Sequence, residues 1–494
     1  MWKHTGTLAV LLALIGTLSY SAEDGLAQTG SPERRPNILF VFSDDLDTYT
    51  LKRAMPKTEA LIGDKGTIFP KALFAQPTCC PSRAAMQRGQ YPHNTGVWDN
   101  VAPQGFQAFY ENGLHKETYA TVLDEAGYKT GYFGKYLNGY GGWTVPKKRA
   151  DGTYDDTLAP LIPGWDKWRV SLGPPVSGVY KFEDGSIRNF ERDTYGLPDR
   201  LATLWAERFI RGASASQGEH PFAAVVSLHA PHHPAEYPKR EPYTTMFAKA
   251  QLPKPPSFDE ADRSDKPKAV RNLSKIDAEE KRELTLYNRE RLRSAAYADN
   301  LTARLLATLD ESGELEDTLV VFWSDNGYHL GQHALESQRV GGKGKPYLED
   351  VRVPLLIRGP GISAGITRTE WINGVDLLPT FADAADAPAP GFVDGRSFLP
   401  LARGEDVQWR GFGYSENPNP VRPWSALYTE GATYHRWGDT GEEELYDLSS
   451  DPYQLGNLLH DPTPEAEAKA AALAGRLDAM QGCAAHSCRT AEGQ

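Results

Sequence analysis

Short apolar runs that end in polar residues are the strongest pattern in this sequence. Residues 37–43, 222–228 and 318–324 are almost entirely apolar, with few polar interruptions. A run without alternation is typical of a strand that is buried on both faces of a parallel sheet. We therefore predict three central strands at these positions.

Each predicted strand leads into side chains that can take part in chemistry. In chain order these are Asp44 and Asp45, then His229, His232 and His233, then Asp325 and Asn326. In open α/β sheets, ligands bind at the carboxyl ends of the strands. We expect these groups to gather at one edge of the sheet.

Helical patterns lie between the predicted strands. Residues 114–126 predict a helix that Gly127 closes, residues 128–134 a short strand that ends at Lys135, and residues 276–309 a long helix with a solvated charged face. Alternating strands and helices predict an α/β sandwich, with a large and mostly parallel sheet between helices.

The pattern of predicted secondary structure changes after about residue 400. Short strand-like runs and turns are followed by an alanine-rich helical pattern at residues 464–480. We predict a large domain over residues 36–400 and a smaller C-terminal α+β domain over residues 401–494.

The N-terminus has the pattern of a secretory signal peptide. Lys3 precedes an apolar run at residues 8–18, and small residues follow as far as Ala27. The run is shorter than the roughly 20 residues that a membrane span needs. We predict a signal peptide over residues 1–27, a secreted or periplasmic protein and no stable membrane insertion after cleavage. An uncleaved anchor is the alternative.

The net charge of the chain argues against some classes of binding partner. Its 494 residues carry a formal net charge of −12, which argues against binding to nucleic acid or to an anionic membrane. A polyanionic substrate would therefore need a local basic patch.

The four cysteines form two pairs, one predicted to form a disulfide and one predicted to stay unbonded. Cys483 and Cys488 lie close together near the C-terminus, and they are the pair predicted to form a disulfide. Cys79 and Cys80 are adjacent and poorly placed to bond each other. Pro81 predicts the start of a helix, which places Cys79 beside a helix N-terminus where an anion is stabilised. The alternative is a pair of buried thiols that only pack.

Oxygen ligands are available for a metal ion at the strand ends. Asp44, Asp45, Asp325 and Asn326 suit a hard cation, Ca²⁺ or Mg²⁺, rather than Zn²⁺, which prefers His and Cys. The alternative for each pair alone is a turn or a helix cap. The repetition of the arrangement at two strand ends favours a metal site.

The order Cys79-x-Pro81-Ser82-Arg83, continued by Gly89, resembles the motif of type I sulfatases. The resemblance implies an alkaline-phosphatase-like fold and a cysteine that a maturation enzyme oxidises to formylglycine. It also implies one divalent cation, usually calcium. The residues it implies are Asp44, Asp45, Cys79, Asp325 and Asn326 for the metal, and Cys79, Arg83, Lys135, His232 and Lys343 for catalysis, with His329 as a further pocket residue.

The resemblance implies a reaction at sulfur. A geminal hydroxyl of hydrated formylglycine, oriented by the metal and deprotonated with help from Asp325, would attack the sulfate ester. Arg83, Lys135 and Lys343 would bind the sulfate oxygens. His232, together with Lys343, would protonate the leaving oxygen. Loss of the second hydroxyl proton would then expel sulfate.

Within the family, the motifs resemble those of N-acetylglucosamine-6-sulfatases and heparan endosulfatases, and the resemblance covers most of residues 36–400. Many sulfatases carry a His two residues after the lysine, where this chain has Leu137, so Asn138 is a candidate for a polar role there. No long basic insertion is present, which favours an exo-acting or small-substrate enzyme. We expect a sulfated carbohydrate such as N-acetylglucosamine 6-sulfate, or an aryl sulfate, as substrate.

Two other functions compete with this interpretation. A phosphodiester or phosphonate monoester hydrolase of the same superfold would use similar tetrahedral esters and metals. A secreted sulfoglycan-binding protein would leave Cys79 unconverted, but it would not need a nucleophile, a metal and an acid together. Substrate specificity is expected to depend on residues 141–200 and 234–275, which the resemblance does not interpret.

Overall fold

Strand β1 (Asn37–Asp44) lies near the middle of the main sheet, and all its residues are buried. The structure is a computed structural model that describes residues 35–142, 159–173, 178–190, 198–215, 220–335 and 341–493. The predicted signal peptide at residues 1–27 lies outside the described residues, as does part of the region 141–200. Burial on both faces explains why the sequence of β1 is continuously apolar.

Ten strands of the described residues form the main sheet, in the order β10-β2-β9-β8-β1-β7-β3-β4-β5-β6. Neighbouring strands from β8 to β4 all run parallel, and the pairs beyond them at β9 and β5 are antiparallel. The strands are β1 (Asn37–Asp44), β2 (Thr67–Phe69), β3 (Lys129–Gly134), β4 (Lys167–Leu172), β5 (Val179–Phe182), β6 (Ile187–Asn189), β7 (Phe222–Pro231), β8 (Thr318–Ser324), β9 (Leu355–Arg358) and β10 (Ile366–Thr367).

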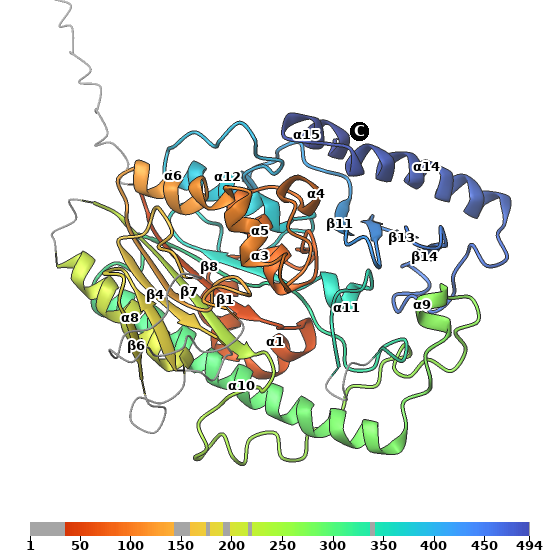
Figure 1. Ribbon diagram of the computed structural model, residues 1–494, viewed down its shortest axis with the longest axis horizontal. Helices are drawn as coiled ribbons and strands as arrows, with labels where there is room; N and C mark the ends of the chain where they lie inside the picture. Colours follow the sequence, from red (N-terminus) through yellow and green to blue (C-terminus); the bar gives the residue numbers. More distant parts are fainter. Residues whose placement is uncertain are drawn as a thin grey trace, which may run out of the picture. The chain divides into compact units, whose positions relative to one another are not determined.

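Helices cover both faces of this sheet (Figure 1). Helices α8 and α10 pack together on one face, where Phe209 of α8 contacts Phe133 of β3 at 5.7 Å between ring centroids. Helices α3, α6 and α12 lie on the other face, where Phe381 of α12 contacts Phe40 of β1 at 5.7 Å. The larger helices are α1 (Thr48–Ala54), α3 (Cys79–Arg88), α5 (Phe106–Glu111), α6 (Tyr119–Glu125), α8 (Pro198–Ser214), α10 (Ala278–Glu311), α12 (Leu377–Ala384), α14 (Pro464–Gln481) and α15 (His486–Glu492).

Shorter helical segments connect these elements. They are α2 (Pro56–Thr58), the π-helix Glu59–Gly63, α4 (Pro92–Thr95), the 3₁₀-helix Leu114–Lys116, α9 (Lys268–Arg271), α11 (Leu348–Val351), the 3₁₀-helix Gly374–Asp376 and α13 (Leu399–Ala402). None of the helices in the described part of the chain is both long and apolar enough to cross a membrane.

Two predicted helix starts are wrong. Helix α3 begins at Cys79 rather than at Pro81, so Pro81 is the third residue of its first turn, where its missing N–H is still tolerated. The helix predicted at residues 114–126 begins only at Tyr119. Thr118 caps that helix through a hydrogen bond from the Ala120 amide (3.2 Å), and the preceding residues form a separate 3₁₀ turn.

A second sheet follows near the C-terminus. Strands β11 (Gly413–Asn417), β12 (Trp424–Tyr428), β13 (Ala432–Trp437) and β14 (Glu443–Asp447) form an antiparallel sheet, and α14 packs against β12 and β13. The predicted α/β sandwich with a mostly parallel sheet and a smaller C-terminal α+β region is confirmed.

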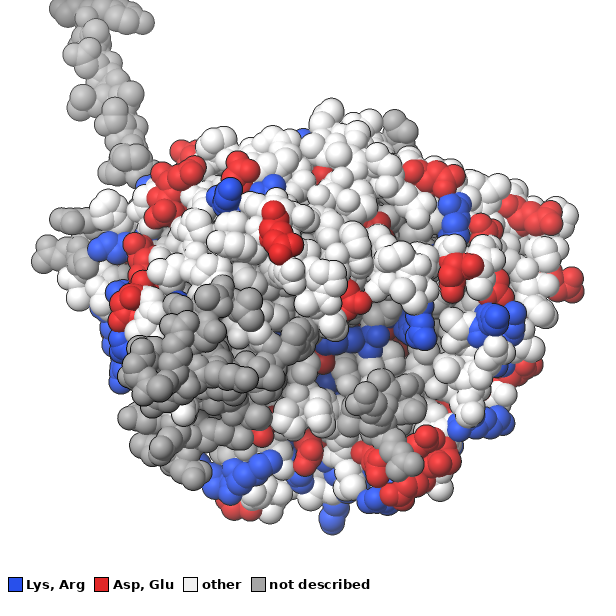
Figure 2. Space-filling view, viewed as in Figure 1, with Lys and Arg blue, Asp and Glu red and all other residues white. Residues whose placement is uncertain are grey.

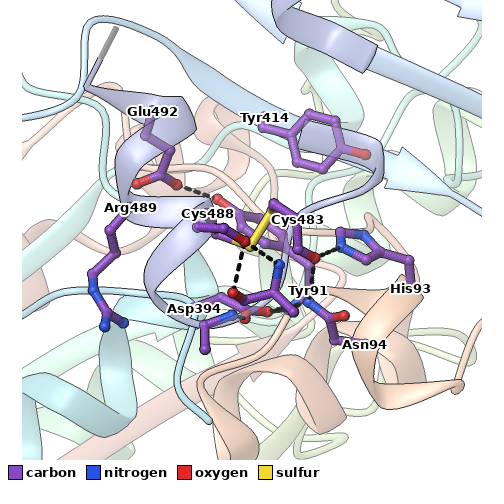
Figure 3. Close-up of a disulfide and its surroundings, with 12 residues drawn as sticks. Tyr91, His93, Asn94, Asp394, Tyr414, Cys483, Cys488, Arg489 and Glu492 are labelled. Atoms are coloured by element: carbon purple, nitrogen blue, oxygen red, sulfur yellow. Dashed lines mark hydrogen bonds between the residues drawn. A yellow bond between two sulfur atoms is a disulfide. The ribbon is translucent and has the colours of Figure 1, made fainter. Parts of the chain in front are cut away.

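The predicted disulfide joins Cys483, which follows α14, to Cys488 in α15 (Figure 3). Beside it, the Asp394 carboxylate accepts hydrogen bonds from the Tyr91 amide (2.7 Å), the Asn94 amide side chain (2.9 Å) and the Ala485 amide (2.6 Å). One buried carboxylate thus fixes the C-terminal segment to the part of the chain that follows α3.

Candidate active site

The carboxyl ends of four neighbouring parallel strands meet at one edge of the main sheet. Strands β8, β1, β7 and β3 lie side by side in this order, so the residues that follow them are brought together although they are far apart in the sequence. Asp44 and Asp45 come from β1, Asp325 and Asn326 follow β8, His232 follows β7, and Lys135 follows β3. The predicted gathering of these side chains is therefore observed.

Cys79 lies at the centre of this group. Its Sγ lies 3.2 Å from Oδ1 of Asp44 and 2.7 Å from Nζ of Lys343, and 4.0 Å from Oδ1 of Asp45. The residue is fully buried. Burial and the Asp44 charge raise the pKa of the Cys79 thiol, so the unmodified side chain is a poor nucleophile at neutral pH.

Arg83 lies one turn further along α3, and its guanidinium contacts residues of β7 and of the loop after β8. Its Nε donates to Oδ2 of Asp325 at 2.7 Å, and one terminal nitrogen donates to Oγ of Ser227 at 2.8 Å. The other terminal nitrogen is buried and has no hydrogen-bond partner among the described residues. An unpartnered guanidinium donor of this kind is ready to bind an anion.

Two lysines neutralise the aspartates of β1. Lys135 forms an ion pair with Asp44, and Lys343 forms one with Asp45. Burial opposes the charge of both carboxylates, but the surrounding cations outweigh it and lower both pKa values, that of Asp44 more strongly. Three carboxylates and three permanent cations therefore share one buried site.

The oxygen donors of the site fit a hard cation. Asp44, Asp45, Cys79 and His232 place one ligand atom each within 4.8 Å of one another. Oδ1 of the buried Asn326 has no hydrogen-bond partner in the described part of the chain, whereas its Nδ2 donates to Oδ1 of Asp45 at 2.8 Å. An orphaned amide oxygen beside carboxylates suits Ca²⁺ or Mg²⁺.

His232 has a defined tautomer. Its Nδ1 lies 2.6 Å from the His233 carbonyl oxygen, which can only accept, so Nδ1 carries the proton. Nε2 then faces the site, 3.8 Å from Oδ2 of Asp45. Burial lowers the pKa of His232 to about 4 in spite of the neighbouring aspartates. The neighbouring His229 is instead held by Asp199, 3.1 Å from its Nδ1.

His329 acts on the site through the backbone. Its main chain exchanges two hydrogen bonds with Gly342 (2.9 and 3.0 Å), and its Nδ1 lies 2.7 Å from Oδ1 of Asp350. The other oxygen of Asp350 accepts from the Lys345 amide at 2.8 Å. His329 and Asp350 therefore fix the segment that carries Lys343, and His329 does not line the adjacent cavity.

A cavity of about 400 Å³ opens beside this group of side chains, and its lining includes Lys135, Asn138, His232, Asn100 and Ser171. Figure 2 shows Lys and Arg side chains next to a hollow in the middle of the visible face. Oδ1 of Asn138 has no hydrogen-bond partner among the described residues. The cavity thus offers polar groups to whatever binds beside Lys135.

Sequence reasoning missed three supporting residues. Ser227 binds Arg83 from within β7, where a polar residue in an apolar run was the only signal. Oδ1 of Asn100 accepts from the Cys80 amide at 2.8 Å. Arg291 donates to the carbonyl of Asp45 at 2.6 Å and holds that residue in a left-handed conformation with φ of 63°. Nothing in the sequence around Asn100 or Arg291 marks them.

The chain matches known family models over most of its length. The model of the sulfatase family matches residues 36–387, and that of the C-terminal region of N-sulphoglucosamine sulphohydrolase matches residues 342–482. The first of these covers most of the main sheet and every candidate site residue.

Curated relatives of this chain carry sulfatase names. An extracellular sulfatase homologue of Drosophila melanogaster is 36% identical over 75% of this chain and 31% of its own length. An N-acetylglucosamine-6-sulfatase of goat is 30% identical over 94% of this chain and 87% of its own length. The chain spans 31% and 49% of the first two relatives, which are extracellular sulfatases of the fly and of Caenorhabditis elegans.

Solved structures share the fold. A protein in complex with its substrate D-glucosamine-2-N,6-O-disulfate has a TM-score of 0.72 at 22% identity, covering 91% of this chain and 98% of that one. A phosphonate monoester hydrolase of Silicibacter pomeroyi has a TM-score of 0.67 at 22% identity, covering 92% and 96%. These likenesses show the fold, and the family model, which matches well over half of the chain, shows the family: the chain belongs to the sulfatase family.

Proposed function

We propose that the protein is a secreted or periplasmic sulfatase that hydrolyses sulfate esters of a sugar through a formylglycine made from Cys79. The observation that carries the proposal is the position of the Cys79 Sγ, between Nζ of Lys343 at 2.7 Å and Oδ1 of Asp44 at 3.2 Å. An unmodified thiol with a raised pKa would gain little from such surroundings. A hydroxyl at the same position would lie among groups that can orient and deprotonate it.

A divalent cation, which we propose to be Ca²⁺, would be held by Asp44, Asp45, Asp325, Asn326 and residue 79. When bound, the cation and the formylglycine would together supply a hydroxyl nucleophile at residue 79 and a positive charge beside the sulfate. The three carboxylates give the site the negative charge that such a cation needs.

Residues of the chain would bind the sulfate group and transfer the protons of the reaction. Arg83, Lys135 and Lys343 would bind the sulfate oxygens and the charge that develops on them, since all three are cations at the same edge of the sheet. Asp325 would accept the proton of the nucleophile. Burial and the Asp44 charge raise its pKa to about 6, and the Arg83, Lys135 and Lys343 charges oppose this rise.

His232 would donate the proton to the leaving oxygen. Nε2 points into the site while Nδ1 is committed to the His233 carbonyl, so Nε2 is the nitrogen that can exchange a proton with substrate. A bound sulfate would add negative charge beside the imidazole and favour its protonation. Lys343 is a second cation within reach of that oxygen.

A sulfated glucosamine is the substrate class that we propose. The goat relative is an N-acetylglucosamine-6-sulfatase, and the structural neighbour binds a disulfated glucosamine. Leu137 stands where many sulfatases carry a second histidine, and the next residue, Asn138, lines the cavity beside Lys135. The side-chain amide of Asn138 would form a hydrogen bond with a sugar hydroxyl or amide. An aryl sulfate is the simplest alternative substrate.

Mass spectrometry of the tryptic peptide spanning residues 72–83 tests the proposal directly. Protein from a host with a formylglycine-generating enzyme should show the mass loss of thiol-to-aldehyde conversion, and fragment ions should place it at Cys79 rather than Cys80. The converted protein should release sulfate from N-acetylglucosamine 6-sulfate. Conversion of Cys79 without release of sulfate from any sulfate ester would contradict the proposed reaction.

The competing functions give different results in the same assay. A phosphonate monoester hydrolase, whose fold this chain shares, would act faster on a phosphonate or phosphate ester than on the matched sulfate ester. A sulfoglycan-binding protein would keep an intact Cys79 thiol.

We further propose that residues 36–400 form the catalytic domain and residues 401–494 the C-terminal subdomain.

A further inference from the structure

A groove outside the candidate active site is lined by positive side chains. Its volume is about 650 Å³, and it shares no lining residue with the cavity beside Lys135. The cations that line it, here called the basic groove, are Lys52 and Arg53 of α1, Lys254, and Arg352 after α11. The chain has a net charge of −12, so a group of four cations along one groove differs clearly from the negative charge of the chain as a whole.

None of these four cations forms an ion pair with any residue that the structure describes. The two carboxylates of the groove are already engaged. Asp47 pairs with Arg291 at 2.7 Å, and Glu349 accepts from Ser257 at 3.5 Å. Lys52 and Arg53 stand in the last turn of α1, where they complement the helix dipole, but this role does not account for Lys254 and Arg352.

Arg352 is the most informative of the four. Burial lowers the pKa of its guanidinium although Glu349 opposes the shift, so its charge is poorly compensated. Its backbone carbonyl accepts from Oγ1 of Thr48 at 3.2 Å, which fixes the start of α1 beside it. A half-buried guanidinium that forms no ion pair and has only one carboxylate nearby is stabilised further when an anion binds.

The walls of the groove are preformed. Oε1 of Gln454 accepts from the Leu348 amide at 3.0 Å and so holds the neighbouring Tyr453 against α11. Tyr49 and Tyr453 line the groove and are 37% and 41% exposed. Exposed tyrosine rings pack well on the apolar face of a sugar ring while their hydroxyls stay in water.

Two residues that line the groove follow the candidate metal ligands closely in the sequence. Asp47 lies two residues after Asp45, and Tyr328 lies two residues after Asn326. The guanidinium of Arg291 packs on the Tyr328 ring at 4.0 Å and binds the Asp45 carbonyl. Arg291 therefore links a residue of the groove to the candidate metal loop at Asp45.

We propose that the basic groove binds a sulfated segment of a glycan chain at a distance from the ester that is cleaved. The proposal rests on the proposed sulfatase function, which supplies a sulfated glycan as the natural polyanion. It differs from the expectation of an exo-acting or small-substrate enzyme, which was based on the absence of a long basic insertion in the sequence, by proposing a longer glycan as substrate. The local patch that a polyanionic substrate needs is assembled from three separate segments instead.

Binding by the full chain carrying Cys79→Ala tests the proposal without turnover. The probe is a fluorescent heparin octasaccharide, titrated at several salt concentrations. The variant Lys52→Gln/Arg53→Gln/Lys254→Gln should bind about tenfold more weakly, with a shallower dependence on salt, because three screened charge contacts are lost. Arg352→Gln, measured separately, should also weaken binding.

A matched control removes the same charge elsewhere. Lys129→Gln/Lys469→Gln/Arg476→Gln changes exposed cations at the amino end of β3 and on α14, and its affinity should equal that of the parent. Equal affinity of the groove variant and the parent, or an equal loss in the control, would overturn the proposal. Tighter binding of a DNA oligonucleotide of the same charge would also overturn it, in favour of a nucleic-acid site.

Kinetics separate this inference from the function on which it rests. In the converted enzyme, the ratio of KM for the 6-sulfated oligosaccharide to KM for the monosaccharide should rise about tenfold in the groove variant. An unchanged ratio with normal sulfate release contradicts the groove alone. Absence of release from every sulfate ester by converted protein contradicts the sulfatase function itself.

Discussion

Nζ of Lys343 lies 2.7 Å from Sγ of Cys79, although 264 residues separate them in the sequence. The same ammonium group pairs with Asp45, and the Asp45 and Asp44 charges keep its pKa well above the ordinary value despite burial. Lys343 therefore stays charged beside residue 79 at any physiological pH. The electrostatic surroundings of residue 79 are therefore set by the fold, with the unmodified cysteine already in place.

Replacement of each thiol in turn should distinguish the nucleophile from its neighbour. Cys79→Ala should abolish sulfate release, because it removes the group that becomes the nucleophile. Cys80→Ala should retain substantial activity at a cost of about 1 kcal/mol in stability, since Cys80 is buried in the core with a thiol pKa raised to about 12. Steady-state rates and thermal melts of both variants give the answer, and equal loss of activity in both would mean that the wrong thiol was identified.

Removal of the cation should inactivate the enzyme without unfolding it. The candidate ligands follow strands that are held by main-chain pairing and apolar packing, so the sheet does not need the metal. After thorough chelation, activity should disappear while the far-ultraviolet circular dichroism stays unchanged, and Ca²⁺ should restore activity at lower concentration than Mg²⁺. Full activity in the metal-free protein would remove Asp44, Asp45, Asp325 and Asn326 from the mechanism.

Asp350→Asn should slow the reaction without touching substrate. The Asp350 carboxylate holds both the His329 ring and the Lys345 amide, and so positions Lys343. Loss of this alignment should lower kcat by about 100-fold and change KM little, as expected for a misplaced catalytic group. A rise in KM at constant kcat would show that Asp350 serves substrate binding. The exposed Asp310→Asn on α10 is the control and should behave as the parent enzyme.

Glu444 should make the protein more stable at neutral than at acid pH. Burial opposes its charge, but His435, Tyr446 and Trp437 donate hydrogen bonds to it and lower its pKa from 4.5 to about 2. A depressed carboxylate pKa contributes stability above the unfolded value, and this contribution, about 3 kcal/mol, is lost as the pH falls from 4.5 toward 2.

The variant Glu444→Gln tests this linkage. Its urea midpoint should lie well below that of the wild type at pH 7, and the two midpoints should converge as the pH approaches 2. Tyr347, which donates to Glu444 at 2.9 Å, connects this residue to the segment that carries Lys343. A difference between the midpoints that is the same at all pH values would show that Glu444 contributes only through packing.

The sequence alone was sufficient for the fold class and for the residues of the strand ends. Continuous apolar runs such as residues 37–43 have one stable solution, a strand covered on both faces, and their polar ends then meet at one edge. Local signals were less reliable for helix starts. A proline is tolerated anywhere in a first turn, so Pro81 did not fix the start of α3 at a single residue.

Only the tertiary structure showed how distant residues support the site. The contacts of Arg291 with Asp45, of Asn100 with Cys80 and of His329 with Gly342 have no local signal, because each joins segments that are neighbours only in the folded chain. The basic groove is the clearest case. Lys52, Lys254 and Arg352 are ordinary surface cations in a sequence with negative net charge, and folding alone places them along one groove. Sequence patterns report which residues a chain buries, whereas the convergence of charges depends on how its segments pack.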